Sequence, residues 1–489
     1  MMGTRIRSVT AGTLATEARA LRETGGRMQF AYAWSPNADD IEVRYVAALP
    51  ERQDFETWLV RSGNQVPSLA HIWPLLGWYE REMMDLSGIR FARHPEPYPL
   101  VLRDGAPSPG NGRDFLEYPP INGKYHLPTI DAKDVQRLPF GPIRADVVES
   151  AEFTFFYVGE HILYYQPRLF FKHRGMETRF EGCSPAYAVV VAERVSGVGT
   201  IAHALAYCEA VERAAGCDVP VRARALRVLL AELERLYNHL HYLGHLCSTT
   251  TLKVGDAQGK LLEERAKQLN ARLTGSRFLR SVLAPGGLRR DLAPDQWLGE
   301  ALEALRIEFV AYVDRLEASE SHLDRLITTG VLPKGVAFDQ GATGPVERAS
   351  GLDRDLRRDH PYAFYAELPV AVTTFEEGDA YARERVRIAE IEAAFALCQR
   401  VLIQLEPGQI RTDCVAPPLS EGLGWSEGSR GSLFYAVHIG GDGTLARVKI
   451  KSPSFSNWRA FPLTVHDSNM MDYAINEASF GLTIAGCDR

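Results

Sequence analysis

Two polar rings, His203 and Tyr207, follow a turn of small residues that runs from Ser196 to Gly199. On a helix, a spacing of four residues puts both rings on one face, directed back over the turn. An imidazole and a phenol placed in this way can hydrogen-bond a carbonyl headgroup, so we expect an acceptor-binding pocket beside the turn. The alternative is a closed core in which the two rings satisfy each other or the backbone.

A second candidate is the histidine pair His241 and His245, which also has a spacing of four residues and lies close to His239. Such a pair can bind a metal, but no glutamate follows His241, so the helix lacks the metalloprotease pattern. The alternative is a pair of capping or interface histidines.

Long amphipathic segments must position these residues. The apolar periodicity predicts helices over residues 223–246, 261–282, 295–327 and 376–405, with a break around Gly255 and Gly259. Helices of this length joined by short breaks indicate a bundle core.

Strands are predicted at residues 28–34 and 41–47 by alternating apolar residues, and near residues 153–165 by an aromatic-rich run. A further helix is expected to open at Val66. The fold class is α+β, with a small α/β domain at residues 25–103 after an extension at 1–24. A linker rich in Pro and Gly follows at 104–122, and the larger domain covers 123–489.

The composition excludes several classes of function. The chain has 489 residues with 55 basic and 62 acidic side chains, which gives no electrostatic case for a nucleic-acid partner. Its seven cysteines are odd in number and irregularly spaced, as in a reduced cytoplasmic protein. No run of about 18 uncharged apolar residues occurs, so we expect no direct membrane span.

The turn resembles that of nickel-iron hydrogenase large subunits, in which Cys-Gly-x-Cys supplies two thiolates. The C-terminal segment Ser479–Arg489 similarly resembles the end of energy-converting hydrogenase subunits, which supplies two more. Here the four ligand positions hold Ser196, Gly199, Thr483 and Gly486, while Cys487 falls one residue out of register. Hydroxyls and glycine cannot replace thiolates on a soft metal, so no metal is expected.

Two further motifs extend the resemblance. Trp78–Phe91 resembles the signature of the 30-kilodalton subunit of respiratory complex I, whose other interpretation is an amphipathic helix with solvated acids. His173-Arg-Gly-Met-Glu177 resembles a motif shared by the 49-kilodalton subunit of complex I and membrane-bound hydrogenases. The resemblance implies that His173, Arg174 and Glu177 contact a small iron-sulfur subunit. The alternative is an Arg-Glu pair that stiffens a turn.

Near the C-terminus, Arg348–Tyr362 and Glu427–Gly431 also resemble motifs of these families, and they place Asp355 and Arg430 at the cavity. The order of parts resembles the fused large subunit of hydrogenase-4 and formate hydrogenlyase. Complex I holds its quinone with a tyrosine in the turn and a loop histidine. Here Gly197 takes the tyrosine position, and the histidine segment is missing after Gly141-Pro142.

The resemblance implies a metal-free subunit of a membrane-associated electron-transfer complex. No cofactor would be bound by this chain, an iron-sulfur cluster would lie in the partner subunit, and quinone is the acceptor that the resemblance implies. Antiporter-like membrane subunits would hold the chain on the inner face of the cell membrane. The alternatives are an active nickel-iron hydrogenase and a non-catalytic scaffold.

Overall fold

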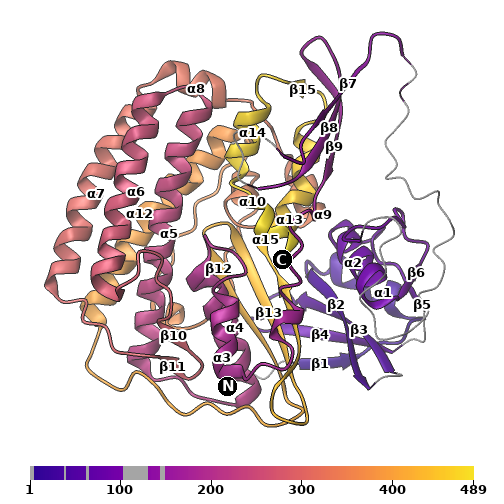
Figure 1. Cartoon of the computed structure of the whole chain (residues 1–489), viewed down its shortest axis with the longest axis vertical. Coiled ribbons are helices and arrows are strands. Elements are labelled where there is room, and N and C mark those ends of the chain that lie inside the picture. The colour runs from indigo at the N-terminus through magenta and orange to yellow at the C-terminus, as the bar shows by residue number, and fades with distance from the viewer. Residues whose placement is uncertain (1–4, 38–39, 62–64, 103–129, 131, 144–148) are drawn as a thin grey trace.

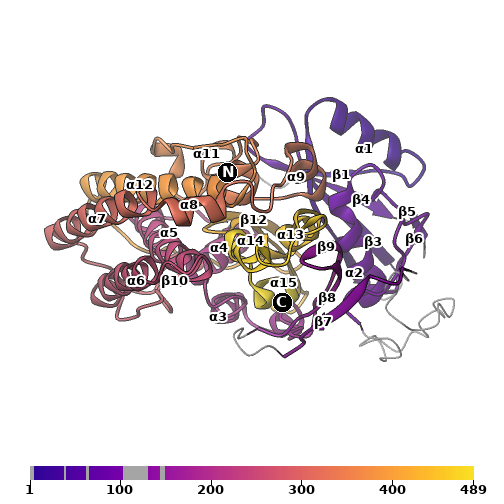
Figure 2. The ribbon, with the colours of Figure 1, turned by 90° about the horizontal axis from the view of Figure 1, so that it is seen from above.

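The computed structural model describes the chain except residues 1–4, 38–39, 62–64, 103–129, 131 and 144–148. A bundle of long helices and a small N-terminal α/β domain lie on opposite sides of the molecule, as Figure 1 shows. A three-stranded sheet and the C-terminal helices lie between them, and Figure 2 shows the same arrangement from above. The α+β fold predicted from the sequence is therefore confirmed.

The N-terminal domain is built on a four-stranded sheet with the order β1-β4-β3-β2. Its elements are β1 (Arg5–Ser8), α1 (Leu14–Glu23), β2 (Arg27–Asn37), β3 (Asp40–Ala48), β4 (Phe55–Arg61), β5 (Gln65–Pro67), η1 (Pro74–Leu76), α2 (Gly77–Ser87) and β6 (Arg90–Ala92). The two strands predicted at residues 28–34 and 41–47 are confirmed as β2 and β3.

Two predictions for this domain are corrected. Residues 1–24 are not a separate extension, because β1 pairs with β4 in parallel and α1 buries Leu14, Ala18 and Leu21. The helix expected at Val66 begins only at Pro74, because Val66 belongs to β5, which pairs with β6. The predicted linker at 104–122 lies outside the described residues.

A second sheet follows, with the order β15-β9-β8-β7. Its strands are β7 (Gln136–Phe140), β8 (Glu152–Val158), β9 (His161–Arg168) and β15 (Ser468–Asn469). The aromatic run near residues 153–165 thus forms the hairpin β8–β9. The chain continues through η2 (Thr178–Phe180), α3 (Pro185–Ala192) and α4 (Thr200–Ala215).

The bundle consists of α5 (Val221–Thr249), α6 (Lys253–Thr274), α7 (Gln296–Glu317) and α12 (Ala380–Gln404). The break predicted at Gly255 and Gly259 is wrong, because both glycines lie inside α6. A Cβ on Gly259 would come within 2.6 Å of the Gly244 Cα, so the two glycines let α5 and α6 approach closely. The chain breaks instead between Thr250 and Leu252.

The single helix predicted over residues 295–327 is also corrected. It ends at Glu317, and α8 (Glu320–Leu326) begins after Ser319. Short elements connect this region to α12: β10 (Leu283–Ala284), β11 (Gly287–Leu288), α9 (Lys334–Gln340), α10 (Pro345–Ala349), α11 (Leu356–Asp359) and η3 (Tyr365–Glu367).

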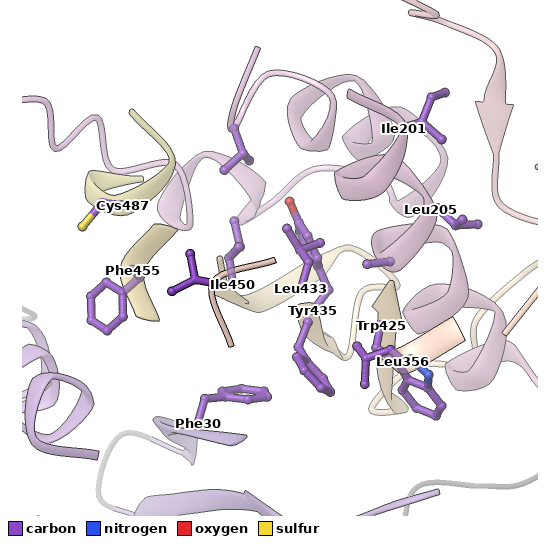
Figure 3. Packing of buried hydrophobic residues seen from close by; sticks show 14 of the residues in the cluster. Phe30, Ile201, Leu205, Leu356, Trp425, Leu433, Tyr435, Ile450, Phe455 and Cys487 are labelled. Atoms are coloured by element: carbon purple, nitrogen blue, oxygen red, sulfur yellow. The ribbon is translucent and has the colours of Figure 1, made fainter. Parts of the chain in front are cut away.

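The central sheet has the order β12-β13-β14, and sequence periodicity did not predict it. Its strands are β12 (Glu421–Gly428), β13 (Gly431–Ile439) and β14 (Leu445–Lys451), followed by α13 (Pro453–Ala460), η4 (Phe461–Thr464), α14 (Tyr473–Phe480) and α15 (Ile484–Asp488). Side chains alternate across a sheet, so β13 directs Tyr435 toward α4 and Phe434 toward Phe30 of the N-terminal domain. Figure 3 shows Tyr435 and Phe30 among the buried residues of this region.

Among the helices formed by the described residues, none combines the length and the hydropathy that crossing a bilayer requires.

Candidate functional site

The turn after α3 and the segment before α15 meet in one small pocket, which we call the turn pocket. Its lining comes from four places in the chain: the turn and α4, the β12–β13 hairpin, the start of α13, and the C-terminal segment. The residues that matter below are Ser196, Gly199, His203, Arg430, Thr483 and Gly486. The space inside is about 30 Å³, enough for one or two water molecules.

Arg174 joins the two sides of the turn pocket. One terminal guanidinium nitrogen donates to the Val195 carbonyl at 2.6 Å and to the Ala485 carbonyl at 3.0 Å, and the other donates to the Arg194 carbonyl at 3.3 Å. The Arg174 backbone N–H also donates to the Arg489 carbonyl. A planar guanidinium thus fastens the turn to the C-terminal segment, as its fork of donors allows.

His203 presents a neutral ring to the pocket. Burial, with a smaller effect from the charge of Arg174, lowers the pKa of His203 to about 3. Its Nδ1 shares a hydrogen bond of 2.8 Å with the Tyr435 hydroxyl, while Nε2 bonds to no described residue. When Tyr435 donates, the ring proton lies on Nε2, where it can be donated to a ligand.

Arg430 brings a cation to the same space from the β12–β13 hairpin. Its Nε donates to the Gly481 carbonyl at 2.7 Å and one terminal nitrogen donates to Asn238 Oδ1 at 3.1 Å. The other terminal nitrogen bonds to no described residue. Burial lowers the pKa of Arg430 to about 10, so the side chain stays charged near neutral pH.

A buried carboxyl supports the helix that carries His203. Glu234 on α5 accepts hydrogen bonds from the backbone N–H groups of Ile201 and Ala202, at 2.6 and 2.9 Å. N–H groups in the first turn of a helix have no acceptor within the helix, so Glu234 caps the start of α4 from the neighbouring helix α5. Burial raises the pKa of Glu234 to about 7, against the opposing effect of those hydrogen bonds.

The structure does not bring Tyr207 to the turn pocket, which corrects its predicted position. Its hydroxyl donates to the Pro185 carbonyl at 2.8 Å, and the side chain is fully buried against Phe180 and Tyr435. The spacing predicted that Tyr207 lies on the same helix face as His203. The neighbouring helix α3, however, supplies a carbonyl that accepts a hydrogen bond from the Tyr207 hydroxyl. The backbone therefore satisfies Tyr207, as the alternative interpretation had it.

The donor set at the four ligand positions does not fit nickel or iron. Ser196 and Thr483 offer hydroxyls, and Thr483 Oγ1 already accepts from the Gly486 N–H in capping α15. Cys487 does not line the pocket, and Figure 3 shows its sulfur directed away from Leu433. Burial raises the pKa of the Cys487 thiol well above its usual value, so it is not a thiolate.

Glu177 does not face outward, so its predicted contact with a partner subunit is corrected. It lies in what we call the C-terminal ion cluster, which consists of Glu82, Glu177, Arg447, Lys449 and Arg489. Arg489 reaches Glu82 of α2 at 2.7 Å and Glu177 at 3.3 Å. The cluster therefore joins the N-terminal domain, the His173–Glu177 segment and the C-terminus. His173 and Arg174 remain exposed.

Asp355 also lies away from the turn pocket, which corrects its predicted place there. Its carboxylate pairs with Arg357 at 2.7 Å and lies 3.4 Å from Arg348. It lines a second cavity, between the N-terminal domain and the β12–β13 hairpin. The two cavities lie on opposite sides of this hairpin.

The rings of His241 and His245 lie parallel on α5, with centroids 6.2 Å apart, and His241 Nδ1 bonds to Glu263 at 3.0 Å. Among the residues that the structure describes, no group of three or more His, Cys, Asp or Glu could hold a metal. Because His241 links α5 to Glu263 on α6, the interpretation as capping or interface histidines fits this geometry better.

Sequence reasoning missed two residues that shape the site. Tyr435 and Glu234 act from a strand and a helix that carry no recognisable motif, and only the fold brings them beside α4. The motif identified Arg174, but the sequence did not show its contacts with three backbone carbonyls, because backbone acceptors leave no trace in side-chain patterns.

Comparison with family models agrees with this geometry. The 49-kilodalton subunit of respiratory-chain NADH dehydrogenase matches residues 261–417 and 410–489, and the 30-kilodalton subunit matches residues 8–115. The model of nickel-dependent hydrogenase matches residues 174–275, which include the turn and all of α4, α5 and α6.

Individual relatives point the same way. Formate hydrogenlyase subunit 5 of Escherichia coli is 30% identical over 83% of this chain and 74% of its own length. The fused C/D protein of NADH-quinone oxidoreductase from Acidiphilium cryptum is 27% identical over 93% and 86%. A chain of the archaeal membrane-bound sulfane sulfur reductase is 26% identical with a TM-score of 0.69, over 74% of this chain and 100% of that chain.

Proposed function

This chain belongs to the family that unites formate hydrogenlyase subunit 5 with the fused C/D proteins of NADH-quinone oxidoreductase, and on that premise we propose that it is an electron-transferring subunit of a membrane-associated complex. In this role, the turn pocket takes an electron acceptor beside an iron-sulfur cluster of a small partner subunit. The supporting observation is that four former ligand positions, a neutral histidine and an arginine line one pocket.

His203 and Arg430 suit the charge that reduction creates. An acceptor gains negative charge as electrons arrive, and a fixed cation with a neutral donor stabilises that charge without rearrangement. The terminal nitrogen of Arg430 and Nε2 of His203 are free to bind because neither bonds to a described residue. Glu234, with a pKa of about 7, keeps a proton-exchanging group behind α4.

The pocket size favours a small acceptor over a ring. A volume of about 30 Å³ holds one or two atoms of ligand, so a quinone headgroup enters only if the hairpin or the C-terminal segment moves. The terminal sulfur of a sulfane chain fits without that movement, and such a substrate is named for the structural relative above. Two electrons from the partner cluster would break the S–S bond, and protonation would release hydrosulfide.

Quinone is the second candidate, and the names of the NADH-quinone oxidoreductase relatives favour it. Both acceptors require the partner to dock near the pocket, and the exposed side chains of His173, Arg174 and Tyr187 offer such a surface. Tyr187 on α3 is 60% exposed, and exposed Tyr and Arg are typical anchors of protein interfaces. Antiporter-like subunits would complete the complex at the membrane.

The test is acceptor-dependent turnover in the assembled complex, with polysulfide and a short-chain quinone compared at equal donor supply. Arg430→Met should lower turnover with the true acceptor at least about tenfold, because a charge that the reduced acceptor needs is lost. Arg306→Met, on the outer helix α7, is the control and should leave turnover unchanged. Equal rates in both variants would show that the pocket does not hold the acceptor.

A further inference from the structure

The second cavity lies where the N-terminal domain meets the hydrogenase-like domain, and we call it the junction cavity. Arg27, Gln29 and Leu49 line it from the N-terminal domain, and Phe338, Arg354 and Ser432 from the other. The space is about 200 Å³, many times the roughly 10–15 Å³ that one water molecule needs.

Arg354 is an anomaly in this cavity. Its guanidinium makes no hydrogen bond or ion pair with any described residue, and its Nη1 is buried. Among the described residues, its guanidinium lies over the face of Phe338, whose centre is 4.9 Å from Cζ. The neighbouring buried guanidiniums of Arg348 and Arg357 each hold carboxylates. Arg354 is partly buried, and a largely desolvated charge without an ion pair is costly, so Arg354 calls for a partner.

The carboxylates around the cavity do not supply that partner, because each is paired with a different arginine. The pairs are Arg27 with Glu347 at 3.1 Å, Arg357 with Asp355 at 2.7 Å, Arg358 with Asp359 at 2.7 Å, and Arg348 with Glu427 at 3.2 Å. These carboxylates are therefore held by other arginines, and none of them forms an ion pair with Arg354. Within the described part of the chain, no acidic group here is arranged to hold a metal.

Two further donors face the same space. Arg27 uses its terminal nitrogens for Glu347 and the Ala342 carbonyl, but its buried Nε has no partner. The amide of Gln29 makes no hydrogen bond with a described residue. Burial, and then the nearby charge of Arg27, lower the pKa of Arg354 to about 10. An anion between the two guanidiniums would accept hydrogen bonds from the unpaired N–H groups and would reduce the repulsion between the two positive charges.

We propose that the junction cavity binds a small oxyanion, a phosphate or carboxylate group, between Arg354 and the Nε of Arg27. A guanidinium with two free N–H groups matches two oxygens of such an anion. Phe338 holds the Arg354 plane from one side, and the Gln29 amide can donate to a third oxygen. The size leaves room for the group that bears the phosphate or carboxylate.

A ligand at this location would connect the N-terminal domain to the rest of the chain. Ser432 faces the junction cavity, while the next residue, Leu433, faces the turn pocket on the other side of the sheet. An anion held by Arg27 and Arg354 ties the N-terminal domain to the segment behind the hairpin that carries Arg430. The site is independent of the acceptor proposed above, because its ligand does not touch the turn pocket.

The experiment measures thermal unfolding of the full chain with increasing phosphate, and separately acetate and succinate, at ionic strength held constant with chloride. Binding to the folded state multiplies the folded-to-unfolded ratio by 1 + [L]/Kd, which is about elevenfold at ten times Kd. Arg354→Met keeps the stem over Phe338 but removes the charge, and it should abolish the response. Arg306→Met is the control, since Arg306 pairs with Glu303 on α7, away from the junction cavity.

The anion that raises the unfolding temperature most identifies the ligand class. Without added anion, Arg354→Met should be at least as stable as the wild type, because a partly buried charge without an ion pair is gone. The proposal is overturned if no oxyanion shifts the wild-type midpoint beyond the chloride control, or if Arg354→Met responds like the wild type. Loss of the response in Arg306→Met alone would also overturn it.

Discussion

The turn pocket and the C-terminal ion cluster share one short segment but differ in how their polar groups are satisfied. Gly486 lines the pocket, and Arg489, three residues later, is held by Glu82 and Glu177 in the cluster. Every charged group of the cluster has an opposite charge within 4 Å, whereas His203 Nε2 and a terminal nitrogen of Arg430 have no described partner. The charges of the ion cluster are therefore mutually satisfied, whereas the turn pocket keeps polar groups that are open to a ligand.

The largest effect is expected from breaking the ion cluster. Arg489→Met leaves two buried carboxylates, Glu82 and Glu177, with fewer counter-charges, and should cost on the order of 3–5 kcal/mol of the free energy of unfolding. Urea unfolding of the purified chain measures this cost. Arg447→Met is the control, because Arg447 is 20% exposed and its loss should cost clearly less. Equal stability of Arg489→Met and the wild type would show that the cluster does not hold the C-terminus.

The second prediction concerns pH. Burial alone would raise the pKa of Glu177, but Lys449, Arg447 and Arg489 outweigh it and lower the pKa to about 2. A carboxyl with a depressed folded-state pKa stabilises the fold above its unfolded value, 4.5, and this contribution is lost as pH falls toward 2. It amounts to on the order of 3 kcal/mol. Glu177→Gln should therefore be less stable than the wild type at neutral pH. Its free energy of unfolding should also change less with pH between these two values. A slope equal to that of the wild type would contradict this assignment.

Arg174 lies between the two regions, since it fastens the turn to the C-terminal segment. Arg174→Lys keeps the charge but cannot reach the carbonyls of Val195 and Ala485 together, and we expect a loss of about 1–2 kcal/mol in the free energy of unfolding. In the assembled complex it should also shift the partner cluster's midpoint potential or loosen the partner subunit. Arg179→Lys, an exposed neighbour, is the control. If stability, potential and copurification all match the control, Arg174 does not join the two sides.

The limits of the sequence are visible in particular residues. The helical period and the strand alternation of apolar residues predicted α5, β2 and β3, because each of these elements buries one regular apolar face. They failed at Gly255 and Gly259, where glycine serves helix contact and not a break. Motif resemblance brought the four ligand positions together, but it put Glu177 at a surface. Its partners Lys449 and Arg489 lie about 270 residues or more further along the chain, and only the fold brings these charges together.

The smallest effect, and the sharpest test of the pocket, comes from two tyrosines beside His203. The Tyr207 hydroxyl donates a hydrogen bond to the Pro185 carbonyl, away from the pocket. The Tyr435 hydroxyl instead shares a hydrogen bond with His203 Nδ1. Tyr207→Phe should cost about 1 kcal/mol of stability and leave acceptor turnover within about twofold of the wild type. Tyr435→Phe removes one hydroxyl from an equally buried ring. The hydrogen bond that fixes the tautomer of His203 is then lost, so this variant should lower acceptor turnover and change the pH profile of turnover. A larger loss of turnover in Tyr207→Phe than in Tyr435→Phe would mean that the acceptor lies on the α3 side of α4, and the turn pocket would then lose its proposed role.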